Sequence, residues 1–284
     1  MLRIIDARTG APVEAVPARR GLTRVEAHVE RYDATALRVL LVADVLVRAL
    51  ELGGTPVWSF LSAERDHAEL RTGAATLGVR PFEDGRATGP GPGAAQIIHV
   101  VGEGGATPDG VRVAVAPVEP EVAHGAQTAD VEGLGGRAGA GASAGLDSAQ
   151  PAHEADGDRA RIAASAPASW TAADPGTLRL ALLSRRRGLP VRLDADALSD
   201  AHDTLVRWRR AVAEWARQPS RPVPEEARGE LRAAWEDDLD VPGVLRTLRW
   251  VEASEFPEGA RFETYAYADR LLGLELTREL GSLA

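Results

Sequence analysis

The stretch ALRVLLVADVLVRALEL, residues 36–52, is the clearest structural element of the chain. It is apolar nearly all round, and Gly53 and Gly54 follow it directly. This pattern predicts a helix that is buried on most sides and that ends at a glycine cap. An apolar run precedes it at residues 2–5, and another, TPVWSFL, follows at residues 55–61. A strand, a buried helix and a second strand are the usual opening of a parallel α/β layer.

The pattern changes twice after this opening. Residues 94–101, AAQIIHVV, fit either a strand or a helix by periodicity. Residues 111–115, VRVAV, alternate after an Asp-Gly turn and therefore predict a strand. The pattern is then lost over residues 119–169, whose centre at residues 133–145 is rich in glycine and alanine. Such a segment buries too little apolar surface to offset its ordering entropy, so we interpret it as a mobile loop or linker.

From Asp174 onward the sequence predicts helices. Asp174 is a cap residue, and Pro175 takes the first helical position. Further helices are expected over residues 194–217, 224–235, 241–251 and 261–272, and short connections between helices imply an antiparallel bundle. The helical spacing predicts a core that includes Leu180, Leu183, Trp208, Trp215, Leu245, Leu248 and Leu271.

Composition restricts the classes of function. The 284 residues contain no lysine and no cysteine, all 33 basic residues are arginine, and the formal charge is −9. An acidic chain is a poor binder of polyanions, so tRNA is not an expected partner. No stretch approaches the ~20 apolar residues of a membrane span, and the N-terminus shows no signal-peptide pattern. We therefore expect a cytoplasmic protein without membrane contact, and the alanine, arginine and glycine bias favours an actinobacterial, GC-rich genome.

Several segments, in order, match the pattern of a known family. Residues 25–35, VEAHVERYDAT, are followed by residues 77–89, LGVRPFEDGRATG, by residues 109–115, DGVRVAV, and by residues 174–187, DPGTLRLALLSRRR. Together they resemble the cysteinyl-tRNA synthetase superfamily, most closely the branch that joins cysteine to an amino sugar in mycothiol synthesis. The resemblance implies a helix at residues 94–101 and an edge strand at residues 109–115.

The resemblance also implies the fold class and the division of the chain. We expect an α/β fold: a reduced Rossmann-like, class I synthetase-type parallel sheet followed by an antiparallel helical bundle. The sheet domain of the nucleotide-binding type would span residues 1–117 and the bundle residues 174–284. Residues 118–173 would form a flexible loop or a remnant of the catalytic segment.

The chain departs from the family where the family carries its chemistry. YDAT, residues 32–35, continues directly into ALR without the HIGH histidines, and no lysine exists for a KMSKS motif. The family's zinc-ligand positions hold Ala27, Ala152 and Asp156, and one ligand out of about four cannot hold zinc. We therefore expect no zinc. The leading interpretation is a catalytically degenerate paralogue, a pseudoenzyme that binds an unknown protein or small molecule.

The alternative is a divergent ATP-dependent aminoacyl ligase that uses arginines for phosphate binding. Arg38 and the cluster at residues 185–187 suit that role, although a solvated helix end is the simpler interpretation of the cluster. ATP would then be the cofactor.

We expect a remnant crevice at Arg38, Asp147, His153 and Glu154, with no catalytic and no metal-ligating residue. The pair His153-Glu154 stands where the family has an active-site pair, and a solvated loop is its simpler interpretation. The remaining histidines show no ligand spacing, and we interpret them as structural or exposed: His28, His67, His99, His124 and His202.

Overall fold

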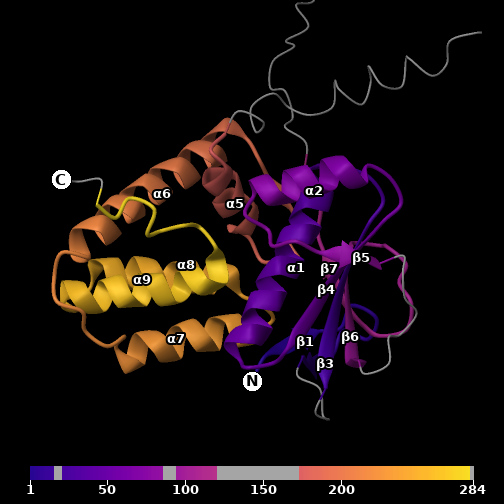
Figure 1. Cartoon of the computed structure of the whole chain (residues 1–284), viewed down its shortest axis with the longest axis horizontal. Coiled ribbons are helices and arrows are strands. Elements are labelled where there is room, and N and C mark those ends of the chain that lie inside the picture. The colour runs from indigo at the N-terminus through magenta and orange to yellow at the C-terminus, as the bar shows by residue number, and fades with distance from the viewer. Residues whose placement is uncertain (16–20, 86–93, 120–172, 282–284) are drawn as a thin grey trace, which may run out of the picture.

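The chain folds into a sheet part and a helical part that adjoin each other, as Figure 1 shows. The computed structural model describes residues 1–15, 21–85, 94–119 and 173–281. The predicted α/β class is confirmed, because a five-stranded parallel sheet runs in the order β5-β4-β3-β6-β7. Its strands are β3 (Leu22–Val29), β4 (Val57–Ala63), β5 (Glu83–Asp84), β6 (Ala94–Gly102) and β7 (Val111–Val115). The Gly/Ala-rich segment predicted at residues 133–145 lies outside the described residues.

Helix α1 (Ala34–Leu52) is the element that the apolar stretch predicted. The side chain of Asp33 caps its start by accepting a hydrogen bond from Ala36 N at 2.7 Å, and Gly53 ends it. One side of α1 contacts β3, β4 and β6, and other sides contact α2 (His67–Thr76) and the helical part. Because neighbours surround it, almost every side chain of α1 is buried, and this explains why its sequence lacks a polar face.

Strand β3 lies at the centre of the sheet and presents different chemistry on its two faces. Val25, Ala27 and Val29 belong to the core that includes α1. The residues between them, Glu26 and His28, point to the opposite face, since side chains alternate along a strand. The segment quoted for its resemblance to the HIGH approach therefore contains most of a strand that the sequence interpretation left unassigned.

The helix predicted for residues 94–101 is wrong, because these residues form strand β6. This strand pairs in parallel with β3 on one side and β7 on the other, and Ile98 and Val100 are fully buried. A strand buried in the middle of a sheet reads as a nearly continuous apolar run, so periodicity could not separate it from a helix. The predicted strand at residues 111–115 is confirmed as β7, at an edge of the sheet.

The predicted N-terminal strand is confirmed as β1 (Arg3–Ile5), but it lies outside the parallel sheet. It pairs antiparallel with β2 (Pro12–Glu14), so the strand that opens the parallel layer is β3. β1 also contacts the loop between the helices α7 (Glu225–Glu236) and α8 (Val241–Ala253). Asp238 N donates to Arg3 O at 2.9 Å, and Ile5 N donates to an Asp238 carboxylate oxygen at 2.8 Å. The start of the chain is thus joined to its C-terminal third.

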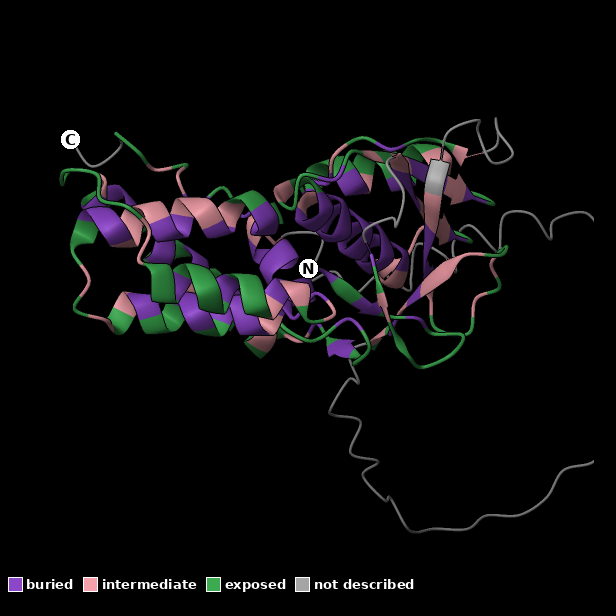
Figure 2. Cartoon of the chain, turned by 90° about the horizontal axis from the view of Figure 1, so that it is seen from below, coloured by how far each residue is buried: buried purple, intermediate pink, exposed green. Residues whose placement is uncertain are grey.

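The predicted helices of the C-terminal part are confirmed. They are α5 (Pro175–Leu183), α6 (Ala195–Trp215), α7 (Glu225–Glu236), α8 (Val241–Ala253) and α9 (Glu258–Leu272). In Figure 2 their inner sides are buried and their outer sides are exposed, as expected of amphipathic helices. All the predicted core residues are buried, and Trp208 and Trp215 pack their rings against Tyr265 at centroid distances of 5.7 and 5.2 Å.

A buried ion pair connects α1 to the helical part. Arg179 of α5 donates to the Asp44 carboxylate of α1 at 2.7 Å, and both side chains are 1% exposed. Arg179 also donates to the carbonyl oxygens of Leu272 and Leu77 at 2.6 and 2.9 Å. One continuous apolar core includes residues from both parts. Among the described residues, no helix is long and apolar enough to cross a membrane.

Candidate functional site

The place where a parallel sheet of this kind binds ligands is the carboxyl edge of its central strands. In open α/β sheets the crevice forms where successive connections leave toward opposite sides. From β3 the chain passes through α1 to β4 on one side, whereas β6 lies on the other side of β3. The crevice is therefore expected outside the carboxyl ends of β3 and β6, beside the start of α1.

A cluster of two imidazoles and a carboxylate lies near this point, on the sheet face away from α1. Glu26 and His28 come from β3, and His99 comes from the adjacent β6. His28 Nε2 and His99 Nδ1 are 2.9 Å apart, and His99 Nδ1 is 3.8 Å from a Glu26 carboxylate oxygen. One nitrogen or oxygen from each of the three side chains lies within 4.8 Å of those of the other two. Two neighbouring strands in register thus bring together donors that are distant in sequence.

The surroundings of His99 determine which of its nitrogens carries a proton. Its Nε2 lies 3.4 Å from the carbonyl oxygen of Asp109, and a carbonyl can only accept a hydrogen bond. His99 Nε2 therefore carries the hydrogen, and Nδ1 presents its lone pair to His28. Gly110 lies against the same ring with φ of 152°, and a Cβ there would be 2.9 Å from His99 Cδ2. The loop between β6 and β7 thus holds the His99 imidazole in place.

Burial and charge keep both imidazoles neutral near pH 7. Burial, with the nearby His99 and Arg24, lowers the pKa of His28 to about 4. Burial also lowers the pKa of His99, and the Asp109 carbonyl and Glu26 only partly oppose that effect. Arg24 lies 3.5 Å from the Glu26 carboxylate and places its guanidinium over the Phe60 ring, 4.1 Å from the centroid. The cluster is therefore polar, nearly enclosed and uncharged apart from the Arg24–Glu26 pair.

The sequence interpretation treated His28 and His99 separately and missed this cluster. The pattern R-V-E-A-H-V over residues 24–29 alternates polar and apolar residues, which would have placed Glu26 and His28 on one strand face. Nothing in the sequence states that β6 pairs with β3 in the register that puts His99 beside Glu26. The strand could have been predicted from the sequence, but the full cluster could not.

Arg38, the predicted crevice residue on α1, lies inside the molecule. Its side chain is 0% exposed, and its guanidinium donates to the carbonyl oxygens of Ala116, Leu189 and Arg186 at 2.7, 2.8 and 3.1 Å. Burial lowers the pKa of Arg38 to about 10. These carbonyls belong to the end of the sheet part and to the turn after α5, so Arg38 connects these two segments.

Two of the three arginines at residues 185–187 are likewise engaged. Arg187 is buried and donates to Ala114 O and Ile5 O at 2.7 and 3.0 Å, besides pairing with Asp238. Arg186 donates to Asp240 at 2.8 Å, and Arg185 is exposed. The other predicted crevice residues, Asp147, His153 and Glu154, lie outside the described residues.

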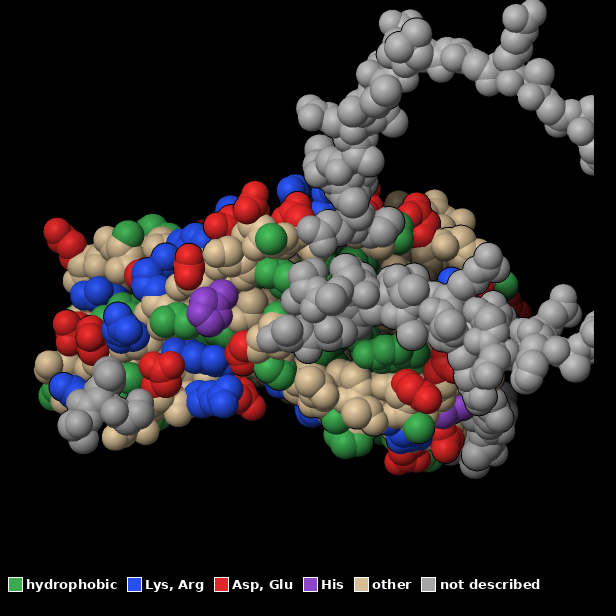
Figure 3. Space-filling model, turned by 90° about the horizontal axis from the view of Figure 1, so that it is seen from above, with side chains coloured by type: hydrophobic (Ala, Val, Ile, Leu, Met, Phe, Trp, Pro, Cys, Tyr) green, Lys and Arg blue, Asp and Glu red, His purple; other side chains and the backbone are tan. Residues whose placement is uncertain are grey.

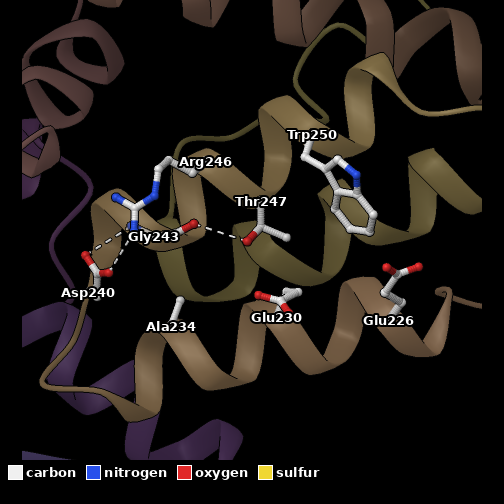
Figure 4. A pocket seen from close by; sticks show the side chains of 8 residues that line it. All are labelled: Glu226, Glu230, Ala234, Asp240, Gly243, Arg246, Thr247 and Trp250. Carbon is white, nitrogen blue, oxygen red and sulfur yellow. Dashed lines mark hydrogen bonds and ion pairs between the residues drawn. The ribbon is translucent and has the colours of Figure 1, made fainter.

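Surface pockets also lie elsewhere among the described residues. The first lies between α7 and α8, has a volume of about 490 Å³, and is drawn in Figure 4. Glu226, Glu230 and Trp250 line one end, and at the other end Asp240 accepts a hydrogen bond from Arg246 at 3.1 Å.

The second pocket lies beside the start of α1, has a volume of about 510 Å³ and is mainly apolar. Its lining residues come from α1, α2 and the start of α5: Tyr32, Leu37, Ala68, Glu69, Thr72, Gly73, Thr76, Leu77, Ala173, Pro175 and Leu178.

Comparison with known proteins gives a consistent relationship. No protein-family model matches the chain. It is 38% identical over 109 residues to the L-cysteine:1D-myo-inositol 2-amino-2-deoxy-alpha-D-glucopyranoside ligase of Streptosporangium roseum. This match covers 37% of this chain and 26% of that ligase. The ligase of the same name from Streptomyces griseus subsp. griseus is 38% identical over 108 residues, covering 36% of this chain and 25% of the ligase. That of Streptomyces scabiei is 36% identical over 108 residues, with the same coverage.

The matched part spans about a quarter of the length of these relatives. Over that part the chain is related to mycothiol cysteine ligases, a cysteinyl-tRNA synthetase-like group, and the resemblance noted in the sequence is confirmed.

Proposed function

We propose that this chain is a binding protein that descends from a cysteine ligase and does not itself activate an amino acid. Its relationship to the ligases supplies the scaffold, a parallel sheet with a crevice at the carboxyl edge. Adenylate formation needs positive groups on the phosphates of ATP, where charge develops as pyrophosphate leaves. The question is therefore which cations of this chain reach that edge.

The observation that carries the proposal is the position of Arg38. It is the arginine of α1 best placed in sequence to substitute for the missing HIGH histidines, yet its two terminal nitrogens donate to four backbone carbonyls. Arg187 is buried in the same way. Each arginine would have to leave its carbonyl partners unsatisfied before it could contact a phosphate, at a cost of ~1–3 kcal/mol for each group. The hydrogen bonds of Arg38 and Arg187 to backbone carbonyls therefore support a structural role for both arginines over a catalytic one.

A second candidate, the divergent ATP-dependent ligase, is favoured by two other arginines. Arg31 and Arg65 follow the carboxyl ends of β3 and β4, and both are exposed. The Arg31 side chain is 70% exposed, with its Nε 3.7 Å from an Asp33 carboxylate oxygen. Arg31 and Arg65 thus lie beside the expected crevice, where an arginine that binds phosphate would be required, rather than inside the core.

Cysteine-dependent exchange of labelled pyrophosphate into ATP separates the two candidates. We expect no exchange above background, with an active cysteine ligase as the positive control. Exchange that is lost in Arg31→Ala, and kept in Arg232→Ala on the surface of α7, would establish the ligase instead. Arg232 is a matched control because it is a 61% exposed arginine whose ion pair, within the described part of the chain, is with Glu236 of its own helix at 3.4 Å.

Thermal unfolding with ATP, AMP or cysteine tests whether the crevice still binds a small molecule. A ligand that binds only the folded state raises its stability by ~2.7 kcal/mol at a hundred times its dissociation constant. Binding of AMP or cysteine without pyrophosphate exchange supports the proposed binding protein. If none of these small molecules binds, we propose a partner protein as the ligand. On the face seen in Figure 3, basic and acidic side chains are interspersed over the helical part. This mixture supports the proposal that tRNA is not the partner, and we also propose a cytoplasmic location.

A further inference from the structure

We propose that Glu26, His28 and His99 form a binding site for one divalent transition-metal ion, held by two imidazole nitrogens and one carboxylate oxygen. This inference does not depend on the proposed function, since it concerns a different set of atoms and a different measurement. It also opposes the sequence expectation of no zinc, which rested on the family's ligand positions. Ala27, which takes one of those positions, points to the opposite face of β3.

The first argument is geometric. Four-coordinate zinc binds histidine nitrogen at ~2.0–2.1 Å and carboxylate oxygen at ~2.0–2.2 Å, which separates tetrahedral ligand atoms by roughly 3.3 Å. The His28–His99 nitrogen separation of 2.9 Å and the His99–Glu26 separation of 3.8 Å lie on either side of that value. The three ligand atoms all lie within 4.8 Å of one another, so side-chain rotations that bring His28 and Glu26 closer would place them in one coordination sphere with the parallel strands fixed.

The second argument is the orientation of His99. A metal-binding histidine usually donates its other ring nitrogen to a carbonyl or carboxylate, which fixes the tautomer and aims the lone pair. His99 Nε2 faces the Asp109 carbonyl at 3.4 Å, so its Nδ1 lone pair points at the centre of the cluster. His28 would release its Nε2 hydrogen bond to His99 and adopt the tautomer that carries hydrogen on Nδ1. Metal binding would then replace one imidazole–imidazole hydrogen bond with two metal–nitrogen bonds.

The third argument concerns the choice of metal. Imidazole nitrogen with one carboxylate suits zinc, cobalt, nickel and iron(II), whereas calcium and magnesium prefer oxygen ligands throughout. Three protein ligands leave a further coordination position open for water or a ligand group. The positive charges of Arg24 and Arg112 face the cluster and weaken its affinity, so we expect weaker binding than in a closed four-ligand zinc site. Arg24 Nη2 lies 3.5 Å from Oε2 of Glu26, the same oxygen that faces His99, and this separation is long for a direct hydrogen bond, so a metal at Oε2 would displace only a weak contact.

The test uses the full chain after treatment with a chelator and removal of that chelator. Cobalt(II) is titrated in while its visible absorption is recorded, and zinc is then added to displace it in competition with a chromophoric chelator. We expect one cobalt per chain with the intense visible bands of a low-coordinate nitrogen and oxygen site. We expect the cobalt affinity to fall at least ~10-fold in His28→Gln, in His99→Gln and in Glu26→Gln, because even the loss of a group that only orients a metal ligand costs ~10–100-fold.

The matched control is His202→Gln, since His202 is exposed on α6 and remote in sequence from the cluster. It should bind cobalt as the unchanged chain does. Unfolding temperatures measured in chelator show whether each variant folds. His28 is only half-buried, so His28→Gln provides the decisive comparison even where His99→Gln fails to fold. The proposal is overturned if the unchanged chain does not bind cobalt or zinc, or if His28→Gln binds as tightly as the control.

Discussion

Replacing Arg38 with alanine distinguishes a structural arginine from one that binds phosphate. The substitution removes three short hydrogen bonds, of 2.7, 2.8 and 3.1 Å, from a charged group to backbone carbonyls, besides a long one of 3.5 Å to Pro117 O. Such bonds contribute ~1.5–3 kcal/mol each, so their gross loss is roughly 4–9 kcal/mol. Part of this loss is offset because the variant no longer buries a charge. We therefore expect the free energy of unfolding to fall by ~3–5 kcal/mol, toward the lower end of that gross loss.

Equilibrium unfolding in urea at pH 7 measures this difference, with Arg232→Ala as the control. That exposed arginine should change the free energy of unfolding by less than ~0.5 kcal/mol. The thermal shift given by ATP is measured on both variants in parallel. A loss below ~1 kcal/mol in Arg38→Ala, together with loss of an ATP-induced shift that Arg232→Ala retains, would refute the structural role and support phosphate binding.

Two further substitutions test the core and its buried charges. Burial raises the pKa of Asp44, but the charges of Arg179 and Arg48 more than offset this and hold its pKa below the ordinary value. A carboxyl group with a depressed pKa stabilises the fold above its unfolded pKa of ~3.9 and loses that contribution as pH falls through the folded pKa. Asp44→Asn should therefore lower the free energy of unfolding by ~3–5 kcal/mol at pH 7. When urea unfolding is repeated at decreasing pH, the free energies of unfolding of the variant and the unchanged chain should converge below about pH 4. A difference that grows on acidification would contradict this account. Trp208→Ala should lower the free energy of unfolding in urea by ~3–5 kcal/mol because Trp208 is fully buried. Trp250→Ala should lower it much less, since Trp250 is 39% exposed. Equal losses in the two variants would place Trp208 outside the core.

The helical part could be predicted from the sequence because its signals are local. Trp208 and Trp215 stand two helical turns apart, and this spacing alone places both on one face. Gly273 marks the end of α9, where it adopts the left-handed conformation with φ of 60°. Helix hydrogen bonds join residues four apart, so sequence and structure carry the same information over this range.

The sheet could be predicted only in part because its signals are not local. Residues 94–101 have the composition of a central strand, but only their pairing with β3 and β7 places them at the centre of the sheet. The cluster of Glu26, His28 and His99 depends on the same pairing, since Glu26 and His99 become neighbours through the register of two strands. The partners of Arg38 could not be predicted for a related reason: the carbonyl groups at residues 116, 186 and 189 are remote from it in sequence. A charged residue in an apolar helix indicates a buried polar contact without identifying the partner.

The contact between β1 and the loop after α7 has a consequence for biosynthesis. Arg3 and Ile5 bond to Asp238, more than two hundred positions later in the chain. A ribosome adding ~5–20 residues each second leaves the N-terminal hairpin without this partner for tens of seconds. Contacts of such long range also slow folding, because a large loop must close before they form. We therefore expect the hairpin to dock only after α7 has emerged, and nascent chains that stop before residue 237 should leave it open to proteases.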